Sequence, residues 1–368
     1  MLTVEAIRKS FKTKTETVTA VAGVGFNVDT GRMLTLLGPS GCGKTSTLRC
    51  IAGLERADSG KIVIDGATLF DGSADIFVPA NKRGMGMVFQ SYAIWPHMSV
   101  YENVAYALNG KGYRSGEVKR LAYEALARVQ LENYADRPAT RLSGGQQQRV
   151  AIARALAGHP KAILFDEPLS NLDTQLRADM RTEIRRLQQE IGMTALYVTH
   201  DQAEALAISD HIIIMRKGEV IEQGGPVEIY RRPKHIFTAS FIGQSNLIAG
   251  KVLSLDPSTR IAAVDSDFGL LRGFDPNGNL QAGEQVMLCI RPEDLSMSTA
   301  SQSEDSLNMI SGIVLVSVFL GSVVEAHLMC GETRIKCEFG RYADVARGKQ
   351  LSLTFAPEAA VVLRAEQA

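Results

Sequence analysis

The octapeptide GPSGCGKT, residues 38–45, has the residue types and spacing that hold a nucleotide phosphate. The pattern G-x-x-x-x-G-K-[ST] is matched by Gly38, Gly43, Lys44 and Thr45, between a strand-like apolar run and a helix-like segment. Glycines let backbone N–H groups at a helix start wrap a β-phosphate. Lys44 would neutralise the β- and γ-phosphates, and Thr45 would offer its hydroxyl to Mg²⁺. The alternative, a glycine-rich turn with a surface lysine, is disfavoured by the strand–helix context.

Two adjacent carboxylates, Asp166 and Glu167, end the apolar run KAILFDEP at 161–168. Successive side chains of a strand point to opposite faces, so the two acids are expected to aim differently. Asp166 would serve the Mg²⁺ shell, and Glu167 would polarise a water for attack on the γ-phosphate. Taken alone, such strand-end acids can simply be solvated or cap a loop, but the upstream phosphate loop favours the catalytic interpretation.

Two further polar residues also end predicted strands. Gln90 follows MGMVF and His200 follows ALYVT. In parallel α/β sheets, ligands gather at the carboxyl ends of the strands. A lone strand-end Gln or His is more often a hydrogen-bonding loop residue. The coincidence with Lys44 and Asp166 instead predicts that all these groups converge at one edge of the sheet.

A second glycine pair lies in LSGGQQQR, residues 142–149, directly before an apolar helical pattern. It lacks the lysine expected of a complete phosphate loop. Ser143, Gly144, Gly145 and the start of the helix can still cap a γ-phosphate that is held elsewhere. The stretch therefore reads as an incomplete half-site.

The elements that position these residues alternate between strand and helix up to about residue 235, which predicts parallel βαβ units. Residues 99–132 read as mainly helical and 175–191 as an amphipathic helix. After 235 the chain consists of short β-like segments separated by turns such as DPNGN, with a polar loop at 298–306. We expect an α/β domain at 1–235, with a helical subdomain at about 91–160, and a β-rich barrel or sandwich at 236–368.

Composition excludes several classes of protein. The 368 residues include 40 basic and 40 acidic side chains, so charge does not favour a nucleic-acid partner. Five cysteines without a CxxC pair argue against a disulfide framework or a zinc site and fit a reducing compartment. The N-terminus has no signal-peptide pattern, and the longest apolar run, 313–324, is too short to span a bilayer.

The motif series resembles the ATP-binding cassette (ABC) ATPases, the motor subunits of ABC transporters, over about residues 1–240. GPSGCGKT resembles their Walker A motif, FQ their Q-loop, LSGGQ their signature, ILFDEP their Walker B motif, SNLD at 170–173 their D-loop and VTH their H-switch. LSGGQ between Walker A and Walker B is highly specific to this family. The resemblance implies a P-loop NTPase cassette with a helical subdomain that binds ATP and Mg²⁺.

The resemblance also assigns residues to roles. It implies catalytic roles for Lys44, Glu167 and His200, and Mg²⁺ ligands at Thr45, Gln90 and Asp166. It implies that Phe11 stacks on adenine. The other implied nucleotide contacts are Gly38, Pro39, Ser40, Gly41, Cys42, Gly43, Lys44, Thr45, Ser46, Gln90, Ser143, Gly144, Gly145, Gln146 and Asp173. In the family the signature caps the ATP held by a second copy, which implies a homodimer.

The β-rich tail resembles the OB-like TOBE extension of bacterial importer ATPases for iron, polyamines, sulfate and maltose, which has regulatory or dimerising roles. Residues 89–108 and 290–297 are most similar to the ferric-iron and polyamine branch. The resemblance implies two transmembrane permease subunits, a periplasmic or lipid-anchored solute-binding protein and a peripheral place on the cytoplasmic face of the inner membrane. Ferric iron is the preferred cargo; polyamine, phosphonate, sulfate and sugar are the alternatives.

Three other interpretations remain open at this point. A soluble ABC ATPase of translation or DNA repair usually carries paired cassettes, a coiled-coil insertion or basic regions. A small-molecule kinase would use the same phosphate loop without LSGGQ. The tail could also be a solute-sensing regulator.

The segment after Gln90 is rich in apolar residues, namely Tyr92, Ile94, Trp95 and Met98. These residues either form part of the core of the helical subdomain or receive the permease's coupling helix.

Overall fold

The computed structural model describes residues 1–368 except 13, 15, 110–111, 299–306 and 366–368. The chain divides into two compact units, Met1–Pro226 and Val227–Ala368. The domain boundary at 235/236 and the subdomain limits at 91–160 stay predictions. Most of the polar loop expected at 298–306 lies outside the described residues.

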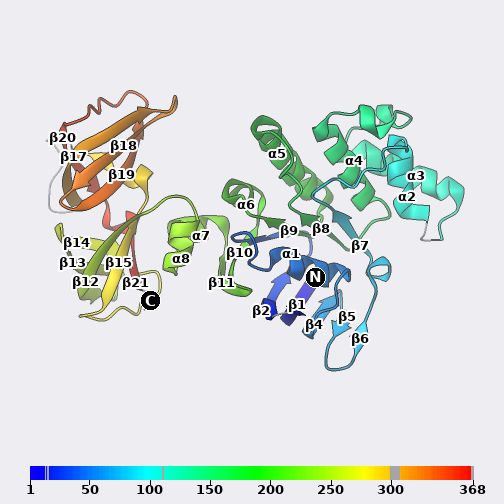
Figure 1. The fold of residues 1–368 in the computed structure, drawn as a ribbon, viewed down its shortest axis with the longest axis horizontal. Coiled ribbons are helices and arrows are strands. Elements are labelled where there is room, and N and C mark those ends of the chain that lie inside the picture. Colours follow the sequence, from blue (N-terminus) through cyan, green and yellow to red (C-terminus); the bar gives the residue numbers. More distant parts are fainter. Residues whose placement is uncertain (13, 15, 110–111, 299–306, 366–368) are drawn as a thin grey trace. The chain divides into compact units, whose positions relative to one another are not determined.

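A mainly parallel sheet forms the centre of the first unit (Figure 1). Its order is β11-β10-β3-β9-β8-β7, with β11 antiparallel to β10 and the other neighbours parallel. Every residue of β3, β8 and β9 is buried, as expected where helices or a second sheet cover both faces. The strands are β3 (Met33–Leu37), β7 (Met85–Val88), β8 (Ala162–Asp166), β9 (Ala195–Thr199), β10 (His211–Arg216) and β11 (Glu219–Gly224).

Successive side chains of β8 and β9 point to opposite faces of the sheet and so contribute to two different apolar cores. Phe165 and Tyr197 face one core, with their ring centroids 5.6 Å apart, whereas Leu164 and Leu196 face the other. The first core also includes residues of the helices α2 (Val100–Asn109), α3 (Ser115–Arg128), α4 (Gly144–Leu156), α5 (Thr174–Ile191) and α6 (Gln202–Ile208). Figure 1 shows α2, α3 and α4 gathered as a helical group, joined by the short turns η2 (Glu132–Tyr134) and η3 (Ala139–Arg141).

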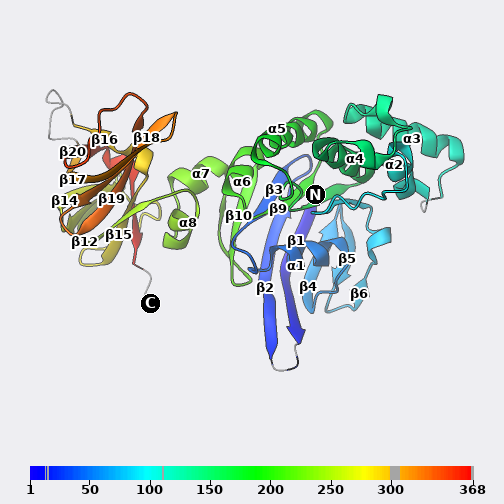
Figure 2. The same ribbon diagram turned by 45° about the horizontal axis from the view of Figure 1, so that its top comes forward.

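The second core lies between the central sheet, helix α1 (Lys44–Ala52) and an antiparallel sheet. That sheet has the order β2-β1-β4-β5-β6, and in Figure 2 its long β1–β2 pair extends away from the helices. Of its five strands, the sequence pattern predicts only β4, from the short continuous apolar run Ile62–Ile64. Its members are β1 (Leu2–Lys12), β2 (Thr17–Val28), β4 (Ser59–Ile64), β5 (Ala67–Asp71) and β6 (Ile76–Phe77), followed by the turn η1 (Ala80–Lys82).

The second unit is β-rich, as predicted. A closed barrel has the order β12-β13-β14-β21-β15, and a five-stranded sheet has the order β16-β20-β17-β18-β19. Both contribute to one apolar core. The barrel strands are β12 (Asn246–Asp256), β13 (Ile261–Ser266), β14 (Gly269–Phe274), β15 (Gln285–Ile290) and β21 (Ala360–Arg364). The sheet strands are β16 (Ser296–Met297), β17 (Asn308–Phe319), β18 (Val323–Cys330), β19 (Thr333–Gly340) and β20 (Gln350–Phe355).

Two short helices precede the barrel, α7 (Pro226–Arg231) and α8 (Ile236–Phe241). Two 3₁₀ turns, η4 (Pro292–Asp294) and η5 (Pro357–Ala359), follow β15 and precede β21. In the part of the chain that the structure describes, no helix combines the length and apolarity needed to cross a membrane.

Candidate active site

The loop between β3 and α1 is built for a close approach to its backbone. Gly41 and Gly43 have left-handed φ angles of 80° and 100°, which L side chains adopt rarely. A Cβ at Gly43 would lie 2.1 Å from the Ala20 carbonyl oxygen, so the position tolerates no side chain. No side chain caps the start of α1. Its first N–H groups therefore remain available to an anion, and the loop fits a phosphate.

Lys44 lies folded back over this loop. Its Nζ donates to the carbonyl oxygens of Gly38 at 2.7 Å and Pro39 at 3.0 Å, and the side chain is buried. Of the predicted loop contacts, Pro39, Ser40 and Gly41 are exposed, whereas Thr45 and Ser46 are half-buried. Burial raises the pKa of the Cys42 thiol, which disfavours a reactive thiolate at this position.

The start of α1 meets the end of β8. Thr45 Oγ1 donates to Asp166 Oδ1 across 3.2 Å. Burial raises the pKa of the Asp166 carboxyl, and the hydrogen bond from Thr45 opposes that rise. A buried carboxylate beside a hydroxyl is a hard-oxygen pair of the kind that Mg²⁺ prefers, and a cation would offset the desolvation of the charge. The residues present therefore fit Mg²⁺.

Glu167 and His200 form a second pair at the same sheet edge. His200 Nδ1 lies 3.0 Å from Glu167 Oε2. Glu167 has a left-handed φ of 46°, which is unusual for a residue with a side chain. Its N–H donates to the Val198 carbonyl oxygen at 3.0 Å, and the Ser170 hydroxyl donates to its carbonyl oxygen at 2.9 Å. These bonds hold the turn that sends Asp166 and Glu167 to different partners.

A buried network supports the chain beyond His200. The hydroxyls of Tyr197 and Thr199 donate to Glu204 Oε2 at 3.0 and 2.8 Å. Asp201 caps α6, because its Oδ1 accepts from the Glu204 N–H at 3.0 Å. Burial raises the pKa of the Glu204 carboxyl. Our reading of the sequence missed this network, although the D-x-x-E spacing of Asp201 and Glu204 is a recognisable helix-start signal.

The segment after Gln90 is fixed by its backbone. Asn171 Nδ2 donates to the Gln90 carbonyl oxygen at 2.9 Å, so the Q-loop and the D-loop are in contact. Tyr92 and Ala93 have left-handed φ angles of 59° and 48°. Arg154 of α4 donates to their carbonyl oxygens at 2.6 and 2.5 Å.

Arg154 is itself buried, and its guanidinium carbon lies 4.9 Å from the centre of the Trp95 ring. Burial lowers the pKa of Arg154. No motif in the sequence marks this arginine. Its position four residues after the buried Val150, on the same helix face, was the available signal.

The signature residues contact α5 and the D-loop of their own chain. Ser143 Oγ accepts from the Gln146 N–H at 3.4 Å, and Gln146 Oε1 accepts from the Ser143 N–H at 3.0 Å, which is a capping box. A Cβ at Gly145 would lie 2.8 Å from Leu176 Cδ1. Asp173 caps α5 through the Leu176 N–H at 3.0 Å.

The structure does not unite all the predicted contacts in one chain. Among the described residues, no hydrogen bond joins Ser143–Gln146 to residues 38–46. Phe11 is exposed on β1, with Lys9 Nζ 5.2 Å from the centre of its ring, and pairs with Val18 of β2. Ala20, two residues further along β2, is the residue whose carbonyl faces Gly43.

Comparisons with known proteins agree with this geometry. Residues 21–170 match the family model described as ABC transporter, and residues 288–363 match the TOBE domain. The Fe(3+) ions import ATP-binding protein FbpC of Rhizobium etli is 45% identical over 88% of this chain and 86% of its own length. The spermidine/putrescine import ATP-binding protein PotA of Pasteurella multocida is 39% identical over 100% of this chain and 98% of its own.

Solved structures give the same result for the first unit. The bacterial ABC transporter cassette MJ0796, solved as a dimer, aligns with a TM-score of 0.53 and 32% identity over 61% of this chain and 99% of its own. The same cassette in a post-hydrolysis state with ADP and Pi aligns with a TM-score of 0.52 and 33% identity over the same shares. The predicted fold class, a P-loop cassette followed by an OB-like β domain, is confirmed: the chain belongs to the ABC transporter family, as an ATP-hydrolysing cassette protein with a TOBE domain.

Proposed function

We propose that this chain is the motor subunit of an importer whose cargo is ferric iron. The observation that carries the motor assignment is the pair of contacts at one sheet edge, Thr45 with Asp166 and Glu167 with His200, beside a glycine loop that fits phosphate. The 45% identity to an iron-import relative over most of both chains supports the cargo.

The side chains divide the work of hydrolysis. The N–H groups at the start of α1 and the Lys44 ammonium bind the β- and γ-phosphates. To reach them, Lys44 exchanges its bonds to the Gly38 and Pro39 carbonyls for bonds to phosphate oxygens. Glu167 accepts a proton from the attacking water. His200, whose Nδ1 lies 3.0 Å from Glu167 Oε2, would orient that carboxylate and bind the γ-phosphate.

Thr45, Asp166 and Gln90 would hold Mg²⁺, which when bound neutralises phosphate charge that develops during transfer. Thr45 and Asp166 already lie 3.2 Å apart. The exposed Gln90 is anchored through its backbone to Asn171, which leaves its side-chain amide free to reach toward them. Phe11 on β1 would stack on adenine, beside the strand that contacts Gly43.

We further infer that two copies of the chain sandwich ATP. Ser143, Gly144, Gly145 and Gln146 would cap a phosphate held by the other copy's loop, with Asp173 beside them. The two copies would act with two permease subunits and a solute-binding protein, on the cytoplasmic face of the inner membrane. The segment anchored by Arg154, which carries Trp95, would face the permease.

Uptake of labelled solutes tests the cargo. In a strain lacking this chain, the wild type should restore uptake of radioactive ferric iron, whereas Glu167→Gln, a folded but inactive control, should not. Sulfate, phosphonate and sugar uptake should be unaffected by either. Restoration of another solute with no change in iron uptake would overturn the iron assignment and leave the motor assignment intact.

A polyamine is the second candidate cargo. The relative named for spermidine and putrescine import aligns over the whole of this chain, at slightly lower identity. The same strain therefore includes labelled spermidine as a parallel arm. Restored spermidine uptake without iron uptake would select this alternative.

A further inference from the structure

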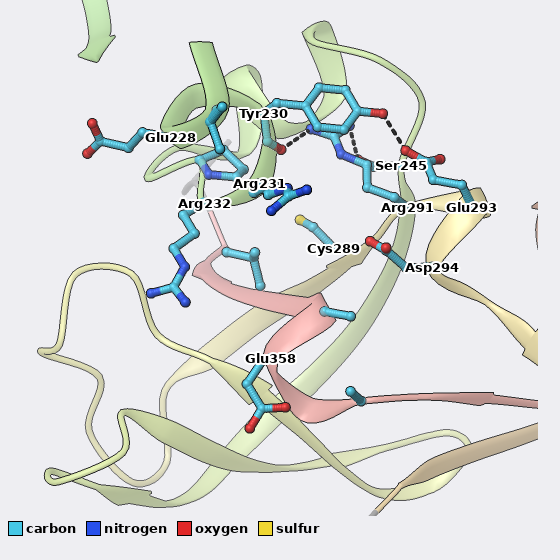
Figure 3. A pocket seen from close by; sticks show the side chains of 15 residues that line it. Glu228, Tyr230, Arg231, Arg232, Ser245, Cys289, Arg291, Glu293, Asp294 and Glu358 are labelled. Atoms are coloured by element: carbon cyan, nitrogen blue, oxygen red, sulfur yellow. Dashed lines mark hydrogen bonds between the residues drawn. The ribbon is translucent and has the colours of Figure 1, made fainter. Parts of the chain in front are cut away.

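A cavity of about 830 Å³ lies entirely within the second unit, between α7, the end of β15 and η5 (Figure 3). Its size falls in the range of ligand sites for small molecules. Its lining shares no residue with the nucleotide site.

The walls of the cavity are held by a buried arginine. The Arg291 guanidinium donates to the carbonyl oxygens of Tyr230 at 2.9 Å, Ala239 at 3.0 Å and Ile242 at 2.5 Å, and to Ser245 Oγ at 2.8 Å. These bonds fix α7 and α8 against the barrel strand that ends at Ile290. The cavity is therefore preformed, so a ligand would not have to order its walls.

Several charged groups of the lining are already engaged. Arg291 is satisfied by the carbonyls, Glu293 accepts the hydroxyl of Tyr230, and Glu228 forms an ion pair with Lys234 at 2.7 Å. These groups build the wall and contribute little free binding capacity.

Four charged side chains of the lining are left over. The side chains of Arg231, Asp294 and Glu358 form no hydrogen bond or ion pair with any described residue. Arg232 stacks on Phe274, with its guanidinium carbon 4.1 Å from the ring centre, and has no carboxylate partner. Figure 3 shows the ends of Arg231 and Asp294 turned into the cavity. Two cations and two anions thus line one cavity without a direct ion pair between them, although the Arg231 charge acts on the Asp294 carboxyl and opposes the rise of its pKa on burial.

Charge complementarity selects the ligand class. An anion alone would meet two unpaired carboxylates, and a cation alone would meet two guanidinium groups. A zwitterion satisfies both signs, with its carboxylate on Arg231 and its ammonium on Asp294 or Glu358. We propose that this cavity is a binding site for a small zwitterion of the amino-acid or dipeptide class.

The rest of the lining calls for an apolar body on that ligand. Val227, Pro233, Ala359 and Val361 supply apolar surface. Cys289 lies at the wall as a neutral thiol, since burial raises its pKa to about 12. Apolar side chains such as those of leucine or phenylalanine match this surface better than polar ones.

Calorimetric titration of the full chain tests the proposal. The probes are L-leucine, L-phenylalanine and the dipeptide leucyl-phenylalanine, with 3-phenylpropanoate and 2-phenylethylamine as analogues that each lack one charge. At least one zwitterion should bind, and both single-charge analogues should bind roughly tenfold or more weakly. Failure of all three zwitterions to bind the wild type would overturn the proposal.

Variants of exposed residues locate the site without disturbing the barrel core. Arg231→Gln and Asp294→Asn should each weaken zwitterion binding roughly tenfold or more, and Arg231→Gln should remove the preference over 2-phenylethylamine. Ala356→Trp should block binding by filling the cavity from its exposed wall. Arg347→Gln and Asp267→Asn, exposed residues outside the lining, are the matched controls. Zwitterion binding that survives all three site variants would place the ligand elsewhere and overturn the assignment.

Discussion

The two glycine-rich loops of the first unit both lead into a helix, yet they prepare those helices differently. In residues 38–45 the glycines have left-handed or tightly packed backbone, and α1 begins without a side-chain cap. In residues 143–146 the glycines are helical, and Ser143 and Gln146 cap α4 reciprocally. The first loop presents its donors to a ligand, whereas part of the second loop's capacity is already used within the chain.

This difference bears on how the second loop can work. At an uncapped helix start, the first backbone N–H groups can donate to a phosphate. In the capped start, the Ser143 hydroxyl accepts from the Gln146 N–H and keeps its own O–H to donate to a phosphate, whereas the Ser143 N–H is already used by Gln146 Oε1. The signature loop therefore holds its shape through bonds within its own chain, and under the proposed function the Ser143 O–H would remain available to a phosphate held by a second copy.

The largest expected effect is a loss of ATP hydrolysis when Glu167, at the sheet edge beside the first loop, is changed. Glu167→Gln should lower steady-state phosphate release on the order of 10²–10⁴-fold, because the amide cannot accept the proton of water. ATP binding should persist, and a dimer should accumulate with ATP in size-exclusion chromatography. Glu190→Gln, on the exposed face of α5, is the control. A variant that hydrolyses at the wild-type rate would remove Glu167 from its role, and a variant that stays monomeric would break the proposed use of the second loop.

Lys44→Ala should lower phosphate release on the order of 10²–10³-fold, because it removes the cation proposed to neutralise the transferring phosphate. Nucleotide affinity, measured by fluorescent ATP-analogue titration, should fall as well. Lys82→Ala, at an exposed lysine in the same unit, should change neither quantity. Retention of most of the activity in Lys44→Ala would show that the first loop is not the principal phosphate site.

Matched Gly→Ala changes compare the two loops directly. Gly43→Ala should destabilise the first unit by about 1–3 kcal/mol from backbone strain, with the Cβ clash against Ala20 in addition. Gly144→Ala places its Cβ 3.4 Å from Leu172, an ordinary contact, and should leave the free energy of unfolding unchanged or raise it by up to about 1 kcal/mol. Trp95, the one tryptophan, lies in the first unit and reports its urea unfolding by fluorescence. Equal effects of the two changes would erase the difference between the loops.

Ser143→Ala should destabilise the same unit by about 1 kcal/mol, since it removes the helix cap of α4. Ser40→Ala, in the exposed part of the first loop, should leave the urea midpoint in place. If the two serine variants unfolded alike, the capping box would contribute nothing to stability.

The smallest expected effect is a pH dependence of the free energy of unfolding, caused by Asp166, the carboxylate at the end of β8 that contacts the first loop. Burial raises the pKa of the Asp166 carboxyl, so the folded chain binds this proton more tightly than the unfolded chain does. The free energy of unfolding therefore falls as the pH rises from the usual aspartyl pKa to the raised pKa of Asp166. Asp166→Asn lacks this penalty. In Mg²⁺-free buffer it should unfold at higher urea than the wild type at neutral pH, and the gap should close as pH falls below the usual aspartyl pKa. A variant that is less stable than the wild type at neutral pH would contradict the assignment.

Sequence patterns predicted β3, β7, β8 and β9 of the central sheet and its polar edge, because buried parallel strands are continuous apolar runs and the motifs lie at their ends; β10 and β11 were not predicted. Residues such as Asp166 and His200 could be placed from strand order alone. The pattern missed most of the antiparallel sheet, whose β1 strand mixes lysines, serines and apolar residues around several register shifts.

Hydrogen bonds from side chains to backbone carbonyls also could not be predicted from the sequence. Nothing in the local sequence says that Arg154 bonds to Tyr92 and Ala93, or that Arg291 bonds to Tyr230 and Ile242, because any residue type supplies such an acceptor. The cavity of the second unit escaped notice for the same reason. Its charges come from α7, η4 and η5, which converge only in the folded chain.

The bonds of Arg291 set a rule for protein engineering with this chain. Because one guanidinium ties Tyr230, Ala239 and Ile242 to the barrel, α7 and α8 travel with the second unit. A chimera that grafts this unit onto another cassette should be joined near 226/227, where the two compact units divide. A junction at 235/236 would import Arg291 without the helix whose carbonyl it requires, and the grafted module would carry a buried cation missing one of its acceptors.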